Sequence, residues 1–174
     1  MPRFLAVAVF FFSLTLCAHA QNPRFGGVWS YDPTRSIALQ SKPVGLLLTV
    51  VADHKEVRVT RSPDPMNRDI DENYACSLDG KPCRSVRNGA PVSWSAHVDG
   101  SALVWSAERI MEAGSSVKWT ERWSLSADGN TLTIDRVFGA VLLQGRTLSQ
   151  EVARTNPEMG RVREVFIRQQ ARGR

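Results

Sequence analysis

Residues 117–138 constrain this chain most, because apolar and polar residues alternate along them on both sides of Asp128-Gly129. An Asp-Gly pair between two alternating runs is the strongest short-range sequence signal for a β-hairpin. Counting outward from the turn brings apolar residues together on one face: Leu125 with Leu132, Trp123 with Ile134, and Trp119 with Phe138. One face of the predicted hairpin is therefore almost wholly apolar, as expected for strands that cover a core.

One pair on this apolar face is charged, because the same count places Glu121 opposite Arg136. A lone buried carboxylate or guanidinium is strongly disfavoured, so we expect the two side chains to be hydrogen-bonded to each other. Two roles are compatible with this prediction. The pair is either a satisfied core ion pair, or Arg136 holds the anionic head group of a ligand while Glu121 orients it.

The first 20 residues have the composition of a cleavable signal peptide. Arg3 precedes an apolar run at residues 4–16 that is too short to span a membrane comfortably, and residues 18–20 match the small-residue cleavage pattern. Lipidation at Cys17 is disfavoured because the residue before it is bulky. The sequence predicts cleavage after Ala20 and a secreted or periplasmic protein.

Residues 21–168 are expected to form one domain, followed by a basic disordered tail at residues 169–174. The formal net charge is +5, and five arginines crowd the C-terminal region: Arg161, Arg163, Arg168, Arg172 and Arg174. This charge is interpreted either as a solvated tail or as a peripheral contact with an anionic envelope surface. Nucleic acid is not an expected partner, because no recognisable binding motif accompanies the charge.

Two cysteines remain after cleavage, Cys76 and Cys83, and they flank a second Asp-Gly turn at residues 79–80. Counting outward from that turn places the two cysteines directly opposite each other on paired strands. Directly opposed residues lie within disulfide reach, and an exported protein folds where disulfides persist. The sequence therefore predicts a cross-strand disulfide within a hairpin that covers residues 70–87.

A third Asp-Gly turn, at residues 99–100, joins alternating runs at residues 92–98 and 102–110. In the predicted register Trp94 lies opposite Trp105, with both rings on the buried face. Altogether the sequence predicts about ten short strands and no clear long helix. The expected fold is all-β, a single antiparallel up-and-down β-barrel of about 8–10 strands, because consecutive hairpins favour a meander and closure removes exposed edges.

The Gly-Val-Trp sequence at residues 27–29 resembles the G-x-W motif that opens lipocalins and the wider calycin group. The hairpin at residues 123–134 is similar to one found in secreted bacterial lipocalin-like proteins. In lipocalins an arginine late in the barrel packs on that tryptophan, and Arg163 and Arg168 are both candidates here. The resemblance implies a lipocalin-like or fatty-acid-binding-like barrel that binds a small apolar or amphipathic ligand.

Enzyme signatures are scarce, since the chain carries no G-x-S-x-G, H-E-x-x-H, P-loop or G-x-G-x-x-G motif. The lack of these motifs disfavours an enzyme, and no cofactor is expected. His54 and His97 are too few for a metal cluster, and we expect both to be exposed. Four acidic residues close in sequence are compatible with a solvated loop, an acidic pair or a calcium site: Asp64, Asp69, Asp71 and Glu72.

The candidate ligand-binding residues are the charged pair and four tryptophans: Glu121, Arg136, Trp94, Trp105, Trp119 and Trp123. Tryptophans at these positions fit either a packed core or the wall of a ligand cavity. Three functions follow: an exported ligand-binding barrel, an envelope-associated interaction or structural module with a filled core, or an enzyme on a barrel scaffold. The volume of the interior separates the first two, since ligand pockets usually measure some hundreds of Å³.

Overall fold

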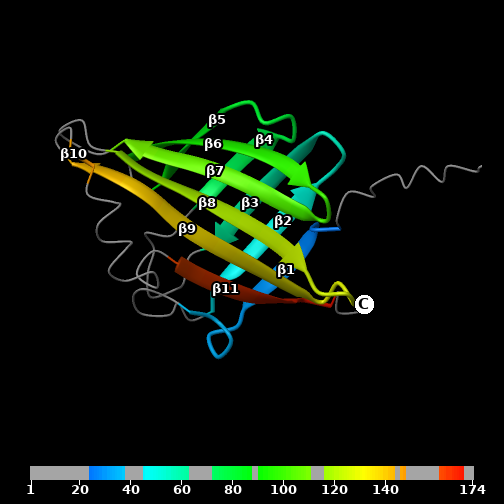
Figure 1. Ribbon diagram of the computed structural model, residues 1–174. Coiled ribbons are helices and arrows are strands. Elements are labelled where there is room, and N and C mark those ends of the chain that lie inside the picture. The colour runs from blue at the N-terminus through cyan, green and yellow to red at the C-terminus, as the bar shows by residue number, and fades with distance from the viewer. Residues whose placement is uncertain are drawn as a thin grey trace, which may run out of the picture.

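The computed structural model describes residues 24–37, 45–62, 72–87, 90–110, 116–143, 146–147 and 161–170. These residues contain eleven β-strands and no helix (Figure 1). The predicted signal peptide and residues 171–174 of the predicted tail lie outside the described residues, and both remain predictions.

The strands form one antiparallel sheet in which neighbours in sequence are mostly neighbours in space. In chain order they are β1 (Gly27–Tyr31), β2 (Leu47–Ala52), β3 (Glu56–Ser62), β4 (Glu72–Ser77), β5 (Cys83–Arg87), β6 (Ala90–Asp99), β7 (Ala102–Ile110), β8 (Ser116–Leu125), β9 (Thr131–Leu143), β10 (Arg146–Thr147) and β11 (Arg161–Arg168). The order across the sheet is β4-β3-β2-β1-β11-β9-β8-β7-β6-β5, and β10 pairs with β9 outside this path.

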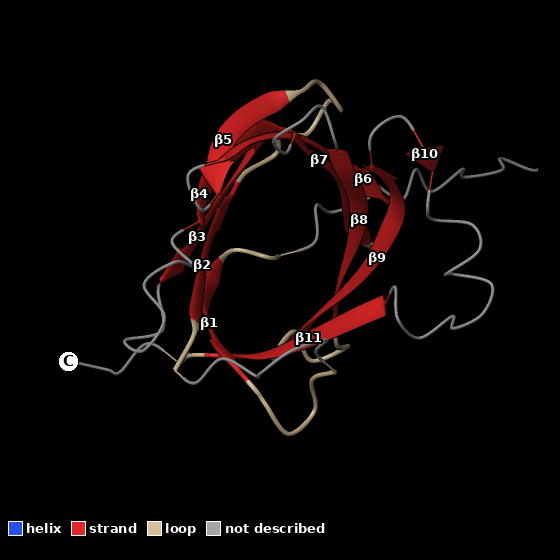
Figure 2. Cartoon of the chain, turned by 90° about the vertical axis from the view of Figure 1, so that its left-hand side faces the viewer, coloured by secondary structure: helices blue, strands red, loops and turns tan. Residues whose placement is uncertain are grey.

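The last strand, β11, joins the first strand to the later hairpins, because it lies between β1 and β9 in the sheet. Tyr31 pairs with Phe166 on one side of β11, and Ile134 pairs with Glu164 on the other. Viewed along the barrel, the strands surround a single interior (Figure 2). The predicted all-β up-and-down barrel is confirmed, and ten strands make up the wall.

The hairpin predicted at residues 117–138 forms in the predicted register. Strands β8 and β9 pair the expected residues: Trp119 with Phe138, Glu121 with Arg136, Trp123 with Ile134, and Leu125 with Leu132. Gly129 in the connecting turn has a φ of 70°, a left-handed conformation that glycine adopts without steric cost. The register shifts only between Val117 and Trp119, where the ladder has a bulge or irregularity.

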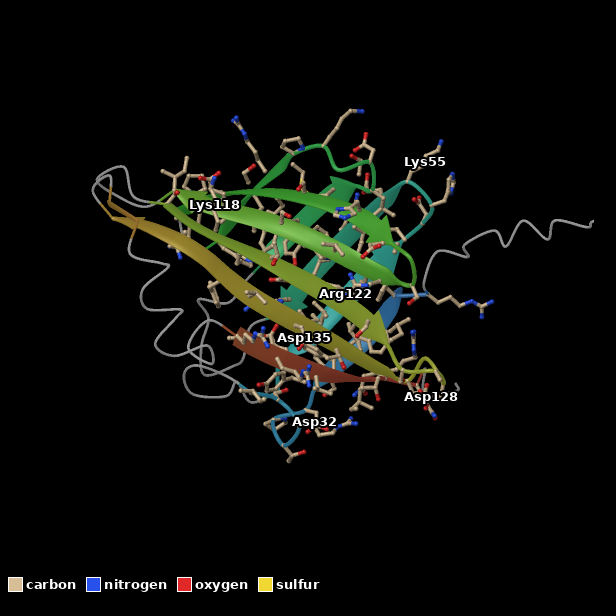
Figure 3. All side chains as sticks on the ribbon, viewed as in Figure 1. Asp32, Lys55, Lys118, Arg122, Asp128 and Asp135 are labelled. Carbon is tan, nitrogen blue, oxygen red and sulfur yellow. A yellow bond between two sulfur atoms is a disulfide. The ribbon has the colours of Figure 1, made fainter. Side chains whose placement is uncertain are left out.

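The barrel interior is the hydrophobic core, because successive side chains of a strand point alternately inward and outward. Rings from several strands meet there and are almost completely buried, among them Trp29, Trp94, Trp105, Trp123 and Phe166. The exposed side chains labelled in Figure 3, which include Lys118 and Arg122, belong to the outer surface. One enclosed core distinguishes this architecture from a two-sheet sandwich.

The predicted register of the β6–β7 hairpin is wrong by two residues. Trp94 pairs with Ala107, and Trp105 pairs with Ala96. The two-residue loop is Gly100-Ser101 rather than Asp99-Gly100, because Gly100 takes the positive φ of 60° at the first loop position. A register shift of two residues leaves each side chain on the same face of the sheet. The two indole rings are therefore buried diagonal neighbours, 6.0 Å apart.

The predicted cysteine pair is confirmed, but the predicted hairpin around it is not. Cys76 and Cys83 form a disulfide, with their Cα atoms 5.4 Å apart. The strands that carry them pair elsewhere, β4 with β3 and β5 with β6, and share no ladder with each other in the described part of the chain. The connecting turn is held by neighbours instead, since Leu78 N donates to Lys55 O and Gly80 N donates to Ala96 O.

Of the two candidate arginines, Arg168 is the one that packs on Trp29, at 4.1 Å from the ring centroid. Its guanidinium donates to the carbonyl oxygens of Gly26, Gly129 and Arg24. Gly27 leaves room for this contact, since a Cβ atom there would lie 2.6 Å from the guanidinium. Arg168 thereby ties residues 24–26 and the end of β11 to the β8–β9 turn.

Candidate functional site

Glu121 and Arg136 lie side by side inside the barrel, on the neighbouring strands β8 and β9. Glu121 is 1% exposed and Arg136 is 7% exposed. The Nε of Arg136 donates to Oε1 of Glu121 at 2.8 Å. The predicted hydrogen-bonded pair is therefore present, and it is buried.

Two tryptophans of β8 also bind the Glu121 carboxylate. Trp119 Nε1 donates to Oε1 at 3.2 Å, and Trp123 Nε1 donates to Oε2 at 2.9 Å. Each tryptophan is two residues away from Glu121, so strand alternation places all three side chains on one face. Glu121 thus accepts hydrogen bonds from two indoles and one guanidinium, which offsets the cost of its burial.

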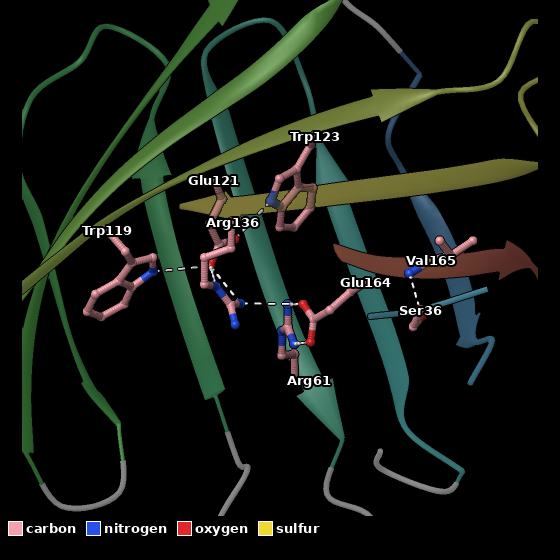
Figure 4. Close-up of polar contacts among 8 residues, drawn as sticks. All are labelled: Ser36, Arg61, Trp119, Glu121, Trp123, Arg136, Glu164 and Val165. Carbon is pink, nitrogen blue, oxygen red and sulfur yellow. Dashed lines mark hydrogen bonds and ion pairs between the residues drawn. The ribbon is translucent and has the colours of Figure 1, made fainter. Parts of the chain in front are cut away.

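A second ion pair meets the first inside the barrel (Figure 4). Arg61 of β3 donates to both carboxylate oxygens of Glu164 on β11, at 3.0 and 2.8 Å. Arg136 also reaches Glu164, with Nη2 at 3.4 Å from Oε2. In the sheet, β1 and β2 separate β3 from β11, so this contact crosses the interior. We call Arg61, Glu121, Arg136 and Glu164 the ionic cluster.

The ionic cluster is electrically balanced, since its two guanidinium groups match its two carboxylates. Burial by itself raises the pKa of Glu121, but the charges of Arg136 and Arg61 outweigh this and hold the pKa below its usual 4.5. Glu121 is therefore ionised at neutral pH. The cluster links β3, β8, β9 and β11, and so connects separate parts of the barrel wall.

We expect the free energy of unfolding to fall as the pH drops below about 4.5, in part because of Glu121. Its pKa is lower in the folded than in the unfolded protein, so the unfolded state takes up the proton first. This contribution is complete above the unfolded pKa and is lost as the pH falls through the folded pKa. Denaturant unfolding at a series of acidic pH values measures it, and Glu121→Gln should flatten the pH dependence.

Asp99→Asn is the matched control for that measurement. The pKa of Asp99 is also lowered, by its hydrogen bond with Arg122, but this pair lies on the exposed surface. Solvent screens such a pair, so its removal should leave most of the acid dependence in place. If the unfolding free energy of Glu121→Gln depends on pH in the same way as that of the parent protein, Glu121 is not responsible for this part of the acid dependence.

The four predicted tryptophans belong to one continuous aromatic group next to the ionic cluster. The Trp94 ring contacts the rings of Trp105 and Trp119, at 6.0 and 5.3 Å between centroids, and Trp105 contacts Trp123 at 5.7 Å. Trp105 also pairs with Glu121 across β7 and β8. All six candidate ligand-binding residues are therefore brought together inside the barrel.

Indole N–H groups in this interior are hydrogen-bonded with one exception. Trp29 donates to Phe25 O, Trp94 donates to Ser85 Oγ, and Trp119 and Trp123 donate to Glu121. Trp105 Nε1 is buried and has no hydrogen-bond partner in the structure. A buried donor without an acceptor is costly, so Trp105 presents an open donor beside the ionic cluster.

Two hollows bordered by described residues lie at the outer surface of the wall. One, of about 450 Å³, extends over β6–β9 and is lined largely by outward-facing side chains such as Ser95, Ser106 and Thr120. The other, of about 390 Å³, lies over β9 and β11 beside Asp135 and Arg163. Trp94 and Trp119 of the aromatic group also border the first hollow, and Arg136 of the ionic cluster borders the second.

The remaining sequence candidates are two histidines and four acidic residues. His54 and His97 are exposed, as predicted. Asp64, Asp69 and Asp71 lie outside the described residues. Within the described ranges, no group of three or more acidic, histidine or cysteine side chains is arranged to hold a metal ion. The described part of the chain also has no helix long and apolar enough to cross a membrane.

The fold defines a class: a near-closed antiparallel up-and-down β-barrel with ten strands in its wall. Apo lipid binding protein 8 of Caenorhabditis elegans matches with a TM-score of 0.53 and 10% identity, over 83% of this chain and 95% of that one. A structure described as AVR2 reaches a TM-score of only 0.33 at 13% identity, over 85% and 97% of the two chains. No family model and no curated protein sequence matches. At these identities the likeness shows the fold alone.

Proposed function

We propose that this protein is an exported barrel that binds a small apolar or amphipathic molecule in its interior. The observation that carries the proposal is the ionic cluster, which places polar groups inside an otherwise aromatic and aliphatic barrel. Binding sites of this kind combine apolar walls with a few convergent polar groups. The calycin-type fold adds support, since the structurally similar nematode protein is described as a lipid binding protein.

The polar end of the ligand is proposed to lie between the ionic cluster and Trp105. The open indole donor of Trp105 suits an acceptor oxygen on the ligand. The charge balance of the cluster argues for an uncharged head group, because an added carboxylate would leave an unpaired negative charge in a buried site. An anionic head group, with Arg136 as its anchor, would require Glu164 to move away or to take up a proton.

We expect oleyl alcohol to bind at least as tightly as oleate at neutral pH. The two probes share one hydrocarbon chain and differ in the charge of the head group. Oleate should gain affinity as the pH falls, because protonation of its carboxyl group removes the excess charge. Displacement of a fluorescent fatty-acid analogue measures both affinities, and Trp105→Phe should weaken alcohol binding because it removes the indole N–H donor.

Trp94→Phe is the control, since the Trp94 indole already donates to Ser85 and is not available to a ligand. If oleate binds more tightly than oleyl alcohol at neutral pH, the preferred head group is anionic and Arg136 is its anchor. If neither probe binds, and native mass spectrometry of protein from its own host retains no small molecule, the ligand-binding proposal fails.

The second candidate is an interaction or structural module with a filled core. Its supporting observation is that Trp94, Trp105, Trp119 and Trp123 contact one another and are at most 4% exposed. In such a barrel the ionic cluster only links separate strands of the wall and so stabilises the fold. The absence of any retained or added ligand would favour this function.

A further inference from the structure

Arg109 lies on the inward-facing side of β7 but is not a member of the ionic cluster. The strand buries Trp105 and Ala107 at alternate positions, and Arg109 continues this series. Its partners across the sheet are Val92 of β6 and Val117 of β8, both apolar. Directly paired residues lie on the same face of a sheet, so Arg109 projects from an apolar part of the inner wall.

The Arg109 guanidinium is not matched by a carboxylate in the described part of the chain. Its Nε atom is buried and makes no hydrogen bond. Glu108, the next residue along the strand, faces outward and forms an ion pair with Lys118 at 3.5 Å. The ionic cluster is already balanced without Arg109. Because arginine keeps its proton in proteins and a buried donor without an acceptor is costly, Arg109 is a positive charge in need of an anion.

Arg109 lies closer to the end of the barrel than Trp105, the other side chain with an open buried donor. Strand β7 runs toward the end of the barrel that faces the viewer in Figure 2, and it ends one residue after Arg109, at Ile110. Trp105 lies four residues earlier, at the level of Glu121 on the neighbouring strand. At about 3.3 Å per residue, the two positions are about 13 Å apart along the inner wall.

One charged and one neutral donor on the same strand suit a ligand with two different polar ends. The planar fork of a guanidinium matches a carboxylate, whereas an indole N–H suits an uncharged oxygen. An extended chain advances by about 3.6 Å for every three bonds, so about 13 Å corresponds to about eleven bonds, as in a twelve-carbon alkyl chain. An aromatic and aliphatic wall lies between the two donors.

We propose that Arg109 binds a carboxylate at the outer end of the ligand while Trp105 binds an uncharged oxygen at its inner end. This inference rests on the proposed function and narrows the ligand to an alkyl acid with a hydroxyl or carbonyl oxygen at its far end. A carboxylate at Arg109 adds no charge to the ionic cluster, so the cluster stays balanced. Oleyl alcohol and oleate each have a single polar end and can therefore satisfy only one of the two donors.

The test compares three probes with the same twelve-carbon chain by isothermal titration calorimetry at neutral pH. They are 12-hydroxydodecanoic acid, 1,12-dodecanediol, which lacks the carboxylate, and dodecanoic acid, which lacks the far oxygen. The hydroxy acid is expected to bind about tenfold more tightly than either of the others, because it alone satisfies both donors. Arg109→Met should abolish its advantage over the diol, and Trp105→Phe should abolish its advantage over dodecanoic acid.

Arg122→Met is the matched control, since it also removes one positive charge but from an outward-facing side chain that pairs with Asp99. It should leave the order of the three affinities unchanged. If the hydroxy acid and the diol bind equally, or if the advantage of the hydroxy acid survives in Arg109→Met, the inference is overturned, whereas binding of oleyl alcohol would still support the proposed function. If neither these probes nor oleyl alcohol bind, the proposed function and the role of Arg109 fail together.

Urea unfolding of the ligand-free protein gives a second readout. Arg109→Met removes an unmatched charge and keeps an apolar side chain against Val92 and Val117, so it should unfold at the same urea concentration as the parent protein or at a higher one. An arginine that stabilises the fold through a partner within the protein would behave in the opposite way. A clearly lower midpoint for Arg109→Met would therefore overturn the inference, because Arg109 would already be matched without a ligand.

Discussion

Replacing Arg136 with methionine is expected to lower the free energy of unfolding by about 3–5 kcal/mol at neutral pH. Arg136 contacts both Glu121 and Glu164, and without it two buried carboxylates face the single guanidinium of Arg61. Removing one partner from a buried ion pair leaves a charge that neither water nor protein compensates. The midpoint and slope of urea unfolding measure the loss.

Arg122→Met is the matched control for this experiment. Arg122 lies next to Glu121 in sequence but points outward, and its exposed side chain pairs with Asp99 at 2.7 Å. An exposed pair contributes little, so the expected change is within about 1 kcal/mol. The double variant Glu121→Gln/Arg136→Met restores the charge balance and should recover part of the stability.

The pH dependence of the Arg136→Met effect provides a further check. At acid pH one of the two leftover carboxylates can take up a proton, so the deficit should shrink as the pH falls. Equal stabilities of Arg136→Met and Arg122→Met at neutral pH would show that Arg136 is not part of a buried ion cluster in solution.

The sequence predicted the half of the site whose pairing is local. Glu121 and Arg136 face each other because one Asp-Gly turn and an uninterrupted alternation fix the register of β8 and β9. The β6–β7 hairpin shows the limit of the same reasoning. There the loop begins at Gly100, so the predicted partners of Trp94 and Trp105 were wrong although their faces were right.

The other half of the ionic cluster was missed because its pairing depends on closure of the barrel. Arg61 and Glu164 are 103 residues apart in sequence, and their strands are not neighbours in the sheet. A local signal did exist. Arg61 continues the inward phase of Val57 and Val59, and Glu164 shares its phase with the buried Phe166. Charged residues on the inward phase of predicted strands are therefore worth pairing with one another before a structure is known.

The cysteine pair illustrates a different limit of sequence analysis. Counting from the turn placed Cys76 and Cys83 at bonding distance, and they are bonded. The same count predicted a ladder between their strands, which does not form in the described residues. The backbone groups of the turn are used by Lys55 and Ala96, which belong to the neighbouring hairpins. Short-range spacing thus determined the covalent bond, whereas the hydrogen bonding was determined by contacts distant in sequence.

Truncation of Trp94 to alanine is expected to cost about 3–5 kcal/mol of unfolding free energy. Trp94 is 1% exposed, and its ring contacts Tyr74, Trp105 and Trp119. Alanine would remove all three ring contacts and leave a cavity, and would also leave Ser85 without its indole partner. Urea unfolding followed by circular dichroism measures the change, since tryptophan fluorescence would itself be altered by the substitution.

Two further variants separate the contributions of this side chain. Trp94→Phe keeps an aromatic ring against Tyr74 but lacks the indole N–H, so it should retain a larger share of the stability than Trp94→Ala. His97→Ala, at an exposed position on the same strand, should change the unfolding free energy by no more than about 0.5 kcal/mol. If Trp94→Ala and His97→Ala unfold at the same urea concentration, then Trp94 is not packed in the core.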